Sequence, residues 1–187
     1  KMRRCSMTRL FYPTLEAQKA KPLPSFAWSV VHIDKDDTDT TPGDGGRGSI
    51  HRATFHGKPV AVRRIEVTSP AARFSIAHLQ QETSHLADFD HPYLLRYIGV
   101  ASDKPGKALG AGVVAELCAF SLMAVIEEHR LRPGHWSGLM LRILSEVAGG
   151  LAFLHARKGS HGRLHPRNVL LTIAFRVKLA DYVGDEH

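Results

Sequence analysis

The chain has 187 residues, of which 43% are hydrophobic and 23% are charged, and its formal net charge is +7. This length and apolar content suit one sizeable core or two small lobes. Two distant cysteines, Cys5 and Cys118, exclude a disulfide scaffold and favour a reducing, cytoplasmic location. The basic residues are scattered among acids, so no nucleic-acid partner is predicted. The longest apolar run, residues 117–126, is too short to cross a bilayer, so no membrane span is predicted.

The first half of the chain changes from irregular to strand-like. Residues 1–27 lack periodicity and contain Lys-Pro-Leu-Pro, so we predict a tail or linker there. Residues 49–55 and 58–67 lie on either side of a His-Gly turn, the second segment is rich in Val and Ala, and together they predict a pair of strands. Ser69 and Pro70 then predict the start of a helix that runs to about Ala87.

The second half adds short strands around a long helix. Residues 93–100, 112–118, 169–172 and 176–179 predict apolar strands, and residues 137–156 predict a helix. Gly149 and Gly150 inside that helix predict a close approach of another segment. Strands first and helices later indicate an α+β architecture in two lobes. The helix should bury one stripe of side chains: Met140, Ile143, Leu144, Val147, Leu151 and Leu154.

Two motifs lie in the strand-rich half. Gly43-x-Gly45-x-x-Gly48-x-Ile50 is a glycine-rich turn of the kind whose backbone N–H groups approach phosphates. Such a turn alone is weak evidence, because any glycine-rich linker can produce it. A strand follows the turn, and the next strand contains Val60-Ala61-Val62-Arg63.

Two further motifs lie in the second half. Residues 161–171 read His-Gly-Arg-Leu-His-Pro-Arg-Asn-Val-Leu-Leu, and Asp181-Tyr182-Val183 follows. Asp181 lies 18 residues after Arg163 in this pattern. The four motifs, in this order and spacing over residues 43–183, resemble the protein kinases, whose patterns are G-x-G-x-x-G-x-V, V-A-I-K, H-R-D-L-x-x-x-N and D-F-G. The hinge and hydrophobic details look most like the tyrosine-kinase-like group.

The resemblance implies an α+β kinase-like fold with a β-rich N-terminal lobe, an αC helix and the beginning of a helical C-terminal lobe. The N-terminal lobe would span residues 28–115, and the hinge with a partial C-terminal lobe residues 116–187. A kinase domain continues beyond the metal-binding Asp, so we expect a fragment truncated after that position.

The resemblance also implies ATP and Mg²⁺ as cofactors, with weakened binding. Asn168 and Asp181 would hold the metal, and Glu82 would pair with Arg63. The backbone at Glu116 and Cys118 would meet the adenine edge. The residues placed around the nucleotide are Gly43, Gly45, Gly48, Ile50, Ala61, Arg63, Glu82, Ala115, Glu116, Cys118 and Leu170.

Three positions that carry the chemistry of kinases are exchanged here. Arg63 and His165 stand where the family has Lys, and Arg163 stands where it has the catalytic Asp. A guanidinium stays protonated at physiological pH and cannot act as a base. General-base catalysis typically contributes about 10²–10⁴-fold in rate, so efficient transfer is not expected. His161 is expected to pack in the internal spine of the family, with Leu86, Tyr97 and Tyr182.

The favoured hypothesis is a pseudokinase that acts in signalling through protein partners, with ATP as a ligand. One alternative is a divergent active Ser/Thr or Tyr kinase, in which a nearby acid such as Asp185 replaces the base. Another is an interaction scaffold that binds no nucleotide.

Overall fold

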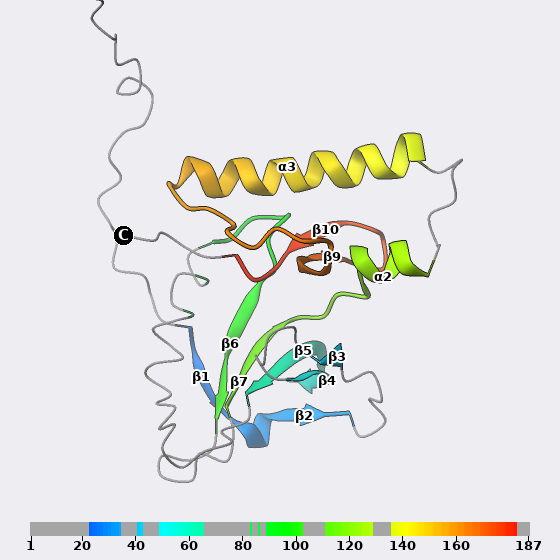
Figure 1. The fold of residues 1–187 in the computed structure, drawn as a ribbon. Helices are drawn as coiled ribbons and strands as arrows, with labels where there is room; N and C mark the ends of the chain where they lie inside the picture. Colours follow the sequence, from blue (N-terminus) through cyan, green and yellow to red (C-terminus); the bar gives the residue numbers. More distant parts are fainter. Residues whose placement is uncertain are drawn as a thin grey trace, which may run out of the picture.

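The computed structural model describes residues 23–34, 41–42, 49–65, 83, 86, 89–102, 111–128 and 136–182. A large curled sheet forms one lobe, and a small sheet with a long helix forms the other (Figure 1). This arrangement confirms the predicted α+β kinase-like fold. Thr83 and Leu86 are buried and helical, and the rest of the helix predicted for residues 69–87 lies outside the described residues.

The large sheet has seven strands in the order β1-β6-β7-β5-β4-β2, and β3 pairs with β4 beside this path. All pairs with printed register are antiparallel except β1 with β6, which is parallel. The strands are β1 (Ser25–Ala27), β2 (Val31–Ile33), β3 (Thr41–Pro42), β4 (Ser49–Phe55), β5 (Lys58–Ile65), β6 (Tyr97–Ser102) and β7 (Ala111–Glu116).

The small sheet has the order β10-β9-β8, and α3 packs against β10 (Figure 1). The core of this lobe joins Ile143 and Leu154 of α3 to Leu171 and Leu179 of the sheet. Its elements are β8 (Phe120–Ser121), α2 (Leu122–Glu127), a π-helical turn (Trp136–Met140), α3 (Leu141–Ala156), a 3-10 turn (Pro166–Asn168), β9 (Val169–Leu171) and β10 (Val177–Leu179).

The predicted strand pair around the His-Gly turn is confirmed as the hairpin β4–β5. His56 and Gly57 both adopt positive φ, 48° and 73°. Two consecutive residues with positive φ suit a type I′ turn, whose twist matches that of the flanking strands. The tight turn sets a register in which Phe55 faces Lys58 and Ile50 faces Arg63.

The sheet begins before residue 28, so the predicted tail of residues 1–27 extends too far. Residues 25–27 form β1, and Leu23 is only 3% exposed. Gly99 on β6 makes room for this segment, because a Cβ there would lie 2.5 Å from the carbonyl oxygen of Pro24 and against the ring of Phe26. The N–H of Val100 donates to that same carbonyl at 2.8 Å.

Residues 93–95 belong to the strand predicted for residues 93–100, but they lie outside β6 and bond to β10. The N–H of Leu95 donates to Leu179 O, and the N–H of Leu179 donates to Tyr93 O, each at 2.8 Å. The strand β6 therefore begins only at Tyr97. These bonds join the segment leading into the large sheet to the small sheet.

The predicted buried stripe on α3 is partly wrong. Ile143 and Leu154 are fully buried, but Leu144 is 54% exposed. One residue along a helix is a rotation of about 100°, so a face centred on Ile143 turns Leu144 away. The predicted close approach is confirmed, because a Cβ on Gly150 would lie 2.8 Å from Leu179 Cδ1.

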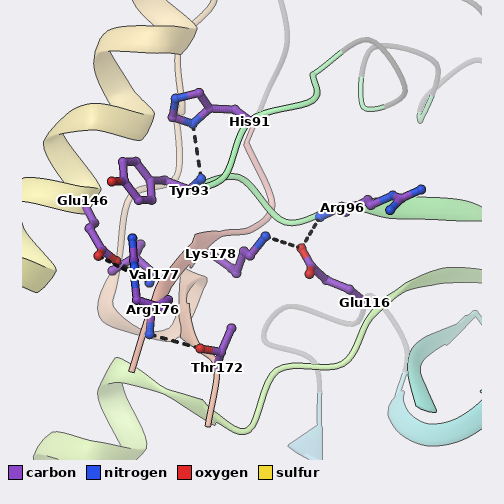
Figure 2. A network of polar contacts seen from close by, with 9 residues as sticks. All are labelled: His91, Tyr93, Arg96, Glu116, Glu146, Thr172, Arg176, Val177 and Lys178. Atoms are coloured by element: carbon purple, nitrogen blue, oxygen red, sulfur yellow. Dashed lines mark hydrogen bonds and ion pairs between the residues drawn. The ribbon is translucent and has the colours of Figure 1, made fainter. Parts of the chain in front are cut away.

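Glu146 lies in the middle of the buried face of α3 and is 4% exposed. Its carboxylate accepts a hydrogen bond from Val177 N at 2.8 Å and pairs with Arg176 Nε at 2.6 Å (Figure 2). A buried carboxylate is tolerated only when its oxygens are paired in this way. Sequence reasoning missed this residue, although an acid three residues after Ile143 on an apolar face was a visible signal.

By length and composition alone, residues 138–156 could also cross a membrane, with a mean hydropathy of 1.4. This helix contains no long unbroken apolar run, because Arg142 and Glu146 interrupt it. Core helices of soluble proteins meet the same criterion, so this is weak evidence. The ion pair between Glu146 and Arg176 is typical of a helix packed on protein.

Replacing Gly99 by Ala should displace β1 from the sheet. The new methyl would collide with Pro24 and Phe26, so the free energy of unfolding should fall by about 1–3 kcal/mol. Urea denaturation measures the change. Gly138→Ala is the matched control, because nothing lies within 4 Å of a Cβ at that position. Equal effects of the two substitutions would contradict the close packing of residues 24–26.

Replacing Glu146 by Ala should leave the N–H of Val177 unpaired inside the protein. We expect the free energy of unfolding to fall by about 2–4 kcal/mol, measured by urea denaturation. Glu127→Ala, an exposed acid at the end of α2, is the control and should change it by no more than about 0.5 kcal/mol. A Glu146→Ala variant as stable as this control would show that the carboxylate does not hold β10.

Candidate functional site

One face of the large sheet gathers four residues that the sequence placed around a nucleotide. Val60 and Val62 pack into the core on the opposite face of β5, so the alternation of the strand puts Ala61 and Arg63 on this face. Directly paired residues share a face in an antiparallel sheet. The pairs Ile50 with Arg63 and Ala61 with Ala115 therefore add the other two residues.

The hinge continues this face with a small apolar cluster. Ala115 is 6% exposed and packs with Leu95 and Ala180, and partly buried Cys118 and Leu170 pack against them. Burial and the nearby charge of Glu116 raise the pKa of the Cys118 thiol to about 12. A thiol with a raised pKa is a poor nucleophile, so Cys118 acts here as an apolar wall.

The side chain of Glu116 ties the hinge to β10. Its Oε1 accepts the N–H of Arg96 at 2.8 Å and pairs with Lys178 Nζ at 2.9 Å (Figure 2). Lys178 is only 17% exposed, so water screens this pair less than it would a surface pair. The hinge is thereby anchored on the strand that precedes Asp181.

The loop after α3 is held by its own backbone. Arg163 N–H donates to His161 O at 2.7 Å, and Asn168 N–H donates to His165 O at 2.8 Å. His165 Nδ1 accepts the N–H of Arg167 at 3.3 Å, which caps the 3-10 turn at residues 166–168. Arg163 and His165 are both exposed. Neither residue offers a carboxylate or a permanently charged amine to a substrate.

Asn168 connects this loop to the end of β10. Its Nδ2 donates to Arg163 O at 2.7 Å, and its backbone carbonyl accepts the N–H of Ala180 at 2.8 Å. The second bond places Asp181 one residue beyond a fixed contact. The two residues that the sequence proposed as metal ligands therefore lie on neighbouring segments.

Asp181 is the residue on which the site converges. Its Oδ1 accepts a hydrogen bond from Arg63 Nη1 at 2.7 Å, in an ion pair whose side chains are 27% and 23% exposed. Its N–H donates to the hydroxyl of Tyr97 at 3.2 Å. Its φ of 56° lies in the left-handed region, which Asp adopts more readily than most residues. Burial, and then the charge of Asp181, raise the pKa of Tyr97 to about 12.

A cluster of buried rings in edge-to-face contact lies next to Asp181 in the chain. The rings of Tyr97 and His161 lie 6.1 Å and 6.4 Å from that of Tyr182, and Leu86 belongs to the same buried cluster. This confirms the predicted packing of His161 in an internal spine. Within the part of the chain that the structure describes, His161 Nε2 and Tyr182 OH are buried without a hydrogen-bond partner. Burial lowers the pKa of His161 and raises that of Tyr182.

Comparison with known proteins agrees with this geometry. Residues 38–183 match the family described as protein tyrosine and serine/threonine kinase. The chain belongs to this kinase family. It is 35% identical over 71% of its length to the serine/threonine-protein kinase/endoribonuclease ire-1 of Caenorhabditis elegans. It is 27% identical over 75% of its length to the proto-oncogene serine/threonine-protein kinase mos of Rattus norvegicus.

The chain spans only part of these relatives, 13% of ire-1 and 44% of rat mos. A putative serine/threonine-protein kinase/receptor of Acanthamoeba polyphaga mimivirus is 27% identical over 75% of the chain, which covers 8% of that protein. The similarity therefore concerns the kinase domain of each relative. Assignment to the tyrosine-kinase-like group stays a prediction.

Arg63 pairs with a residue that the resemblance did not imply. The implied partner, Glu82, lies outside the described residues, as do Gly43, Gly45 and Gly48, so that pair stays a prediction. Among the described residues the partner is Asp181, and sequence reasoning did not propose this pair. Its signal was the exchange of Lys for Arg at residue 63, because the guanidinium is longer and carries more donors.

The residues proposed to bind the nucleotide and those proposed to bind the metal have different surroundings. Ala61, Ala115 and Leu170 form a small-residue, apolar surface of the kind that lines ligand sites. Mg²⁺ requires oxygen ligands in near-octahedral geometry. Asp181 gives one oxygen to Arg63 at 2.7 Å, which competes with a cation at that oxygen. Asn168 donates through its amide nitrogen, so its oxygen, the atom that could bind a metal, is not used by that bond. The Asp181 carboxylate, and not Asn168, is therefore the position at which these residues fit a magnesium ion poorly.

The lowered pKa of His161 should make the fold sensitive to acid. Between this lowered pKa and the ordinary value of 6.5, the unfolded chain binds more protons than the folded one. The free energy of unfolding should therefore fall as the pH falls below about 6.5, and it should fall less in His161→Phe. Urea denaturation at pH 7 to 5 measures both slopes.

The matched control is His155→Phe, which changes an exposed imidazole near the end of α3. Its acid slope should follow that of the unmodified protein. A His161→Phe slope that also follows the unmodified protein would show that the buried imidazole does not take up the proton.

Proposed function

We propose that this chain is a pseudokinase: a kinase-family domain that holds a nucleotide, transfers phosphate inefficiently and acts in cytoplasmic signalling by binding protein partners. One observation carries the proposal. Between residues 161 and 182 the only carboxylate is Asp181, and that carboxylate is in an ion pair with Arg63. No acid in this segment is left to accept the proton of a substrate hydroxyl.

The exchange at residue 163 removes the chemistry that the family needs. In kinases an Asp of the catalytic loop accepts the proton from the attacking hydroxyl. Arg163 is exposed at that position and keeps its proton. Loss of a general base alone costs about 10²–10⁴-fold in rate. The nearby His165 stands at the Lys position, and its Nδ1 accepts the backbone N–H of Arg167 at the 3-10 turn.

Nucleotide binding is supported by the sheet face that remains. Ala61 and Ala115 are paired across two strands, and both are small. Leu170 packs against the same cluster from the small sheet, so both lobes contribute apolar side chains at this point. Small and apolar side chains of this kind suit the flat face of an adenine ring.

Partner binding follows from what the chain retains. The described residues keep the kinase-like fold, the hinge anchor at Glu116 and the buried spine. A domain that keeps its fold after losing its catalytic base can still present a surface to other proteins. The relatives are named as Ser/Thr kinases, so residual transfer to protein hydroxyls is the result against which the proposal is tested.

The unmodified chain should incorporate no more labelled phosphate than Asp181→Ala. The assay uses γ-labelled ATP with Mg²⁺ or Mn²⁺ and a generic basic protein substrate, and the measured quantity is phosphate per mole of substrate. The comparison in which we expect activity to rise is a triple variant that restores all three family residues: Arg63→Lys, Arg163→Asp and His165→Lys. We expect it to exceed the unmodified chain.

Incorporation by the unmodified chain that Asp181→Ala abolishes would overturn the proposal. It would establish an active kinase with a base supplied from elsewhere. Arg167→Lys, an exposed change in the same loop, is the control for effects of loop substitution as such.

A further inference from the structure

We propose that the guanidinium of Arg63 takes the place of a divalent metal ion beside Asp181, so that this domain binds a nucleoside triphosphate without Mg²⁺. The inference rests on the nucleotide binding proposed above and specifies its charge balance. A triphosphate needs positive charge near its oxygens, and in this family the metal supplies much of it. The structure points to a protein side chain in that position.

The first step is the geometry of the pair. Arg63 Nη1 lies 2.7 Å from Asp181 Oδ1, within the range of a charge-assisted hydrogen bond. Arg63 comes from the large sheet and Asp181 from the segment after β10, so the pair spans the two lobes. It lies on the face of β5 that also carries Ala61. A ligand seated on that face would meet the guanidinium.

The second step is that Asp181 is fixed by contacts independent of Arg63. The hydroxyl of Tyr97 accepts its N–H, and Ala180 beside it donates to Asn168 O. The strand before it pairs with β9 along its whole length. The carboxylate is thus held in place, and Arg63 reaches it from a regular strand. Two fixed backbones make the ion pair a feature of the fold.

The third step is the donor inventory of Arg63. A guanidinium carries five N–H donors in a planar fork. Within the described part of the chain, its side-chain hydrogen bond to Asp181 uses Nη1 alone. The other donors remain for the oxygens of a phosphate, which the planar fork can bind two at a time. Arg63 can therefore join a carboxylate to a phosphate, as a metal ion does.

The fourth step is the charge of the surrounding segment. Residues 161–182 contain four permanent cations and one acid: Arg163, Arg167, Arg176, Lys178 and Asp181. Arg176 and Lys178 pair with Glu146 and Glu116, and Arg163 and Arg167 are exposed in the loop. A dication placed at Asp181 would be repelled by Arg63 at hydrogen-bond distance from the same oxygen. The protein charge favours a triphosphate and disfavours the metal.

The experiment is calorimetric titration of the complete chain with ATP, once in excess EDTA and once in millimolar Mg²⁺. We expect dissociation constants that agree within about threefold, since the metal adds no ligand that Arg63 has not replaced. Arg63→Gln should weaken binding in EDTA by at least about tenfold, because the charge on the phosphates is then unbalanced. Arg64→Gln is the matched control, an exposed neighbour on the other face of β5.

Asp181→Asn provides a second variant if Arg63→Gln fails to fold. Without the carboxylate, Arg63 is free for the phosphates, so binding in EDTA should persist or strengthen. A metal-dependent site would respond in the opposite way and lose affinity for ATP in Mg²⁺. Weaker ATP binding in Arg63→Gln, together with unchanged or stronger ATP binding in Asp181→Asn, is therefore expected only if Arg63 balances the charge of the phosphates.

Two results would overturn the inference, and they differ from each other. Binding that requires Mg²⁺ in the unmodified chain, and is lost in Asp181→Asn, would refute the replacement of the metal and leave nucleotide binding intact. Absence of binding in both EDTA and Mg²⁺ would refute the nucleotide binding on which the inference rests, and the replacement with it.

Discussion

The backbone of β10 is held from three directions, and the geometry of the site depends on it. β9 pairs with it along one edge. Residues 93–95 bond to Leu179 on the other side, and Glu146 on α3 accepts the N–H of Val177 (Figure 2). Because each partner comes from a different part of the chain, β10 cannot move without breaking contacts in both lobes. Asp181 follows this strand by two residues, so its position is set before any side chain of the site is considered.

The ion pair between Arg63 and Asp181 joins the two lobes at that fixed point. In the kinase family the corresponding Lys and Asp serve the phosphates and the metal separately. In this chain Arg63 stands at the Lys position, and its Nη1 lies 2.7 Å from Asp181 Oδ1. This ion pair joins the two charges and makes the carboxylate less available to a cation. The fold of an enzyme can be kept while its charge balance is altered.

The burial of polar groups explains why the contact between α3 and β10 and the packing around His161 should be sensitive to substitution and to pH. Glu146 is satisfied by two donors, whereas His161 Nε2 and Tyr182 OH have no partner among the described residues. A paired buried charge fixes the register of its neighbours. Burial lowers the pKa of the His161 imidazole, so we expect the stability of the packing around it to depend on pH. Glu146 therefore fixes the position of β10 against α3, and His161 should make the stability of the fold depend on pH.

The sequence by itself determined the family, the hairpin β4–β5, the long helix and the exchange at Arg163, because turn residues, periodicity and motif spacing are local properties. It also indicated the close packing at Gly150. Only the tertiary structure decided that Arg63 pairs with Asp181, that residues 93–95 join β10, that residues 25–27 belong to the sheet, and that Leu144 faces outward while Glu146 is buried. Each of these depends on which distant segment lies beside a residue. Side-chain reach and burial are properties of the packed chain, so no local pattern could specify them.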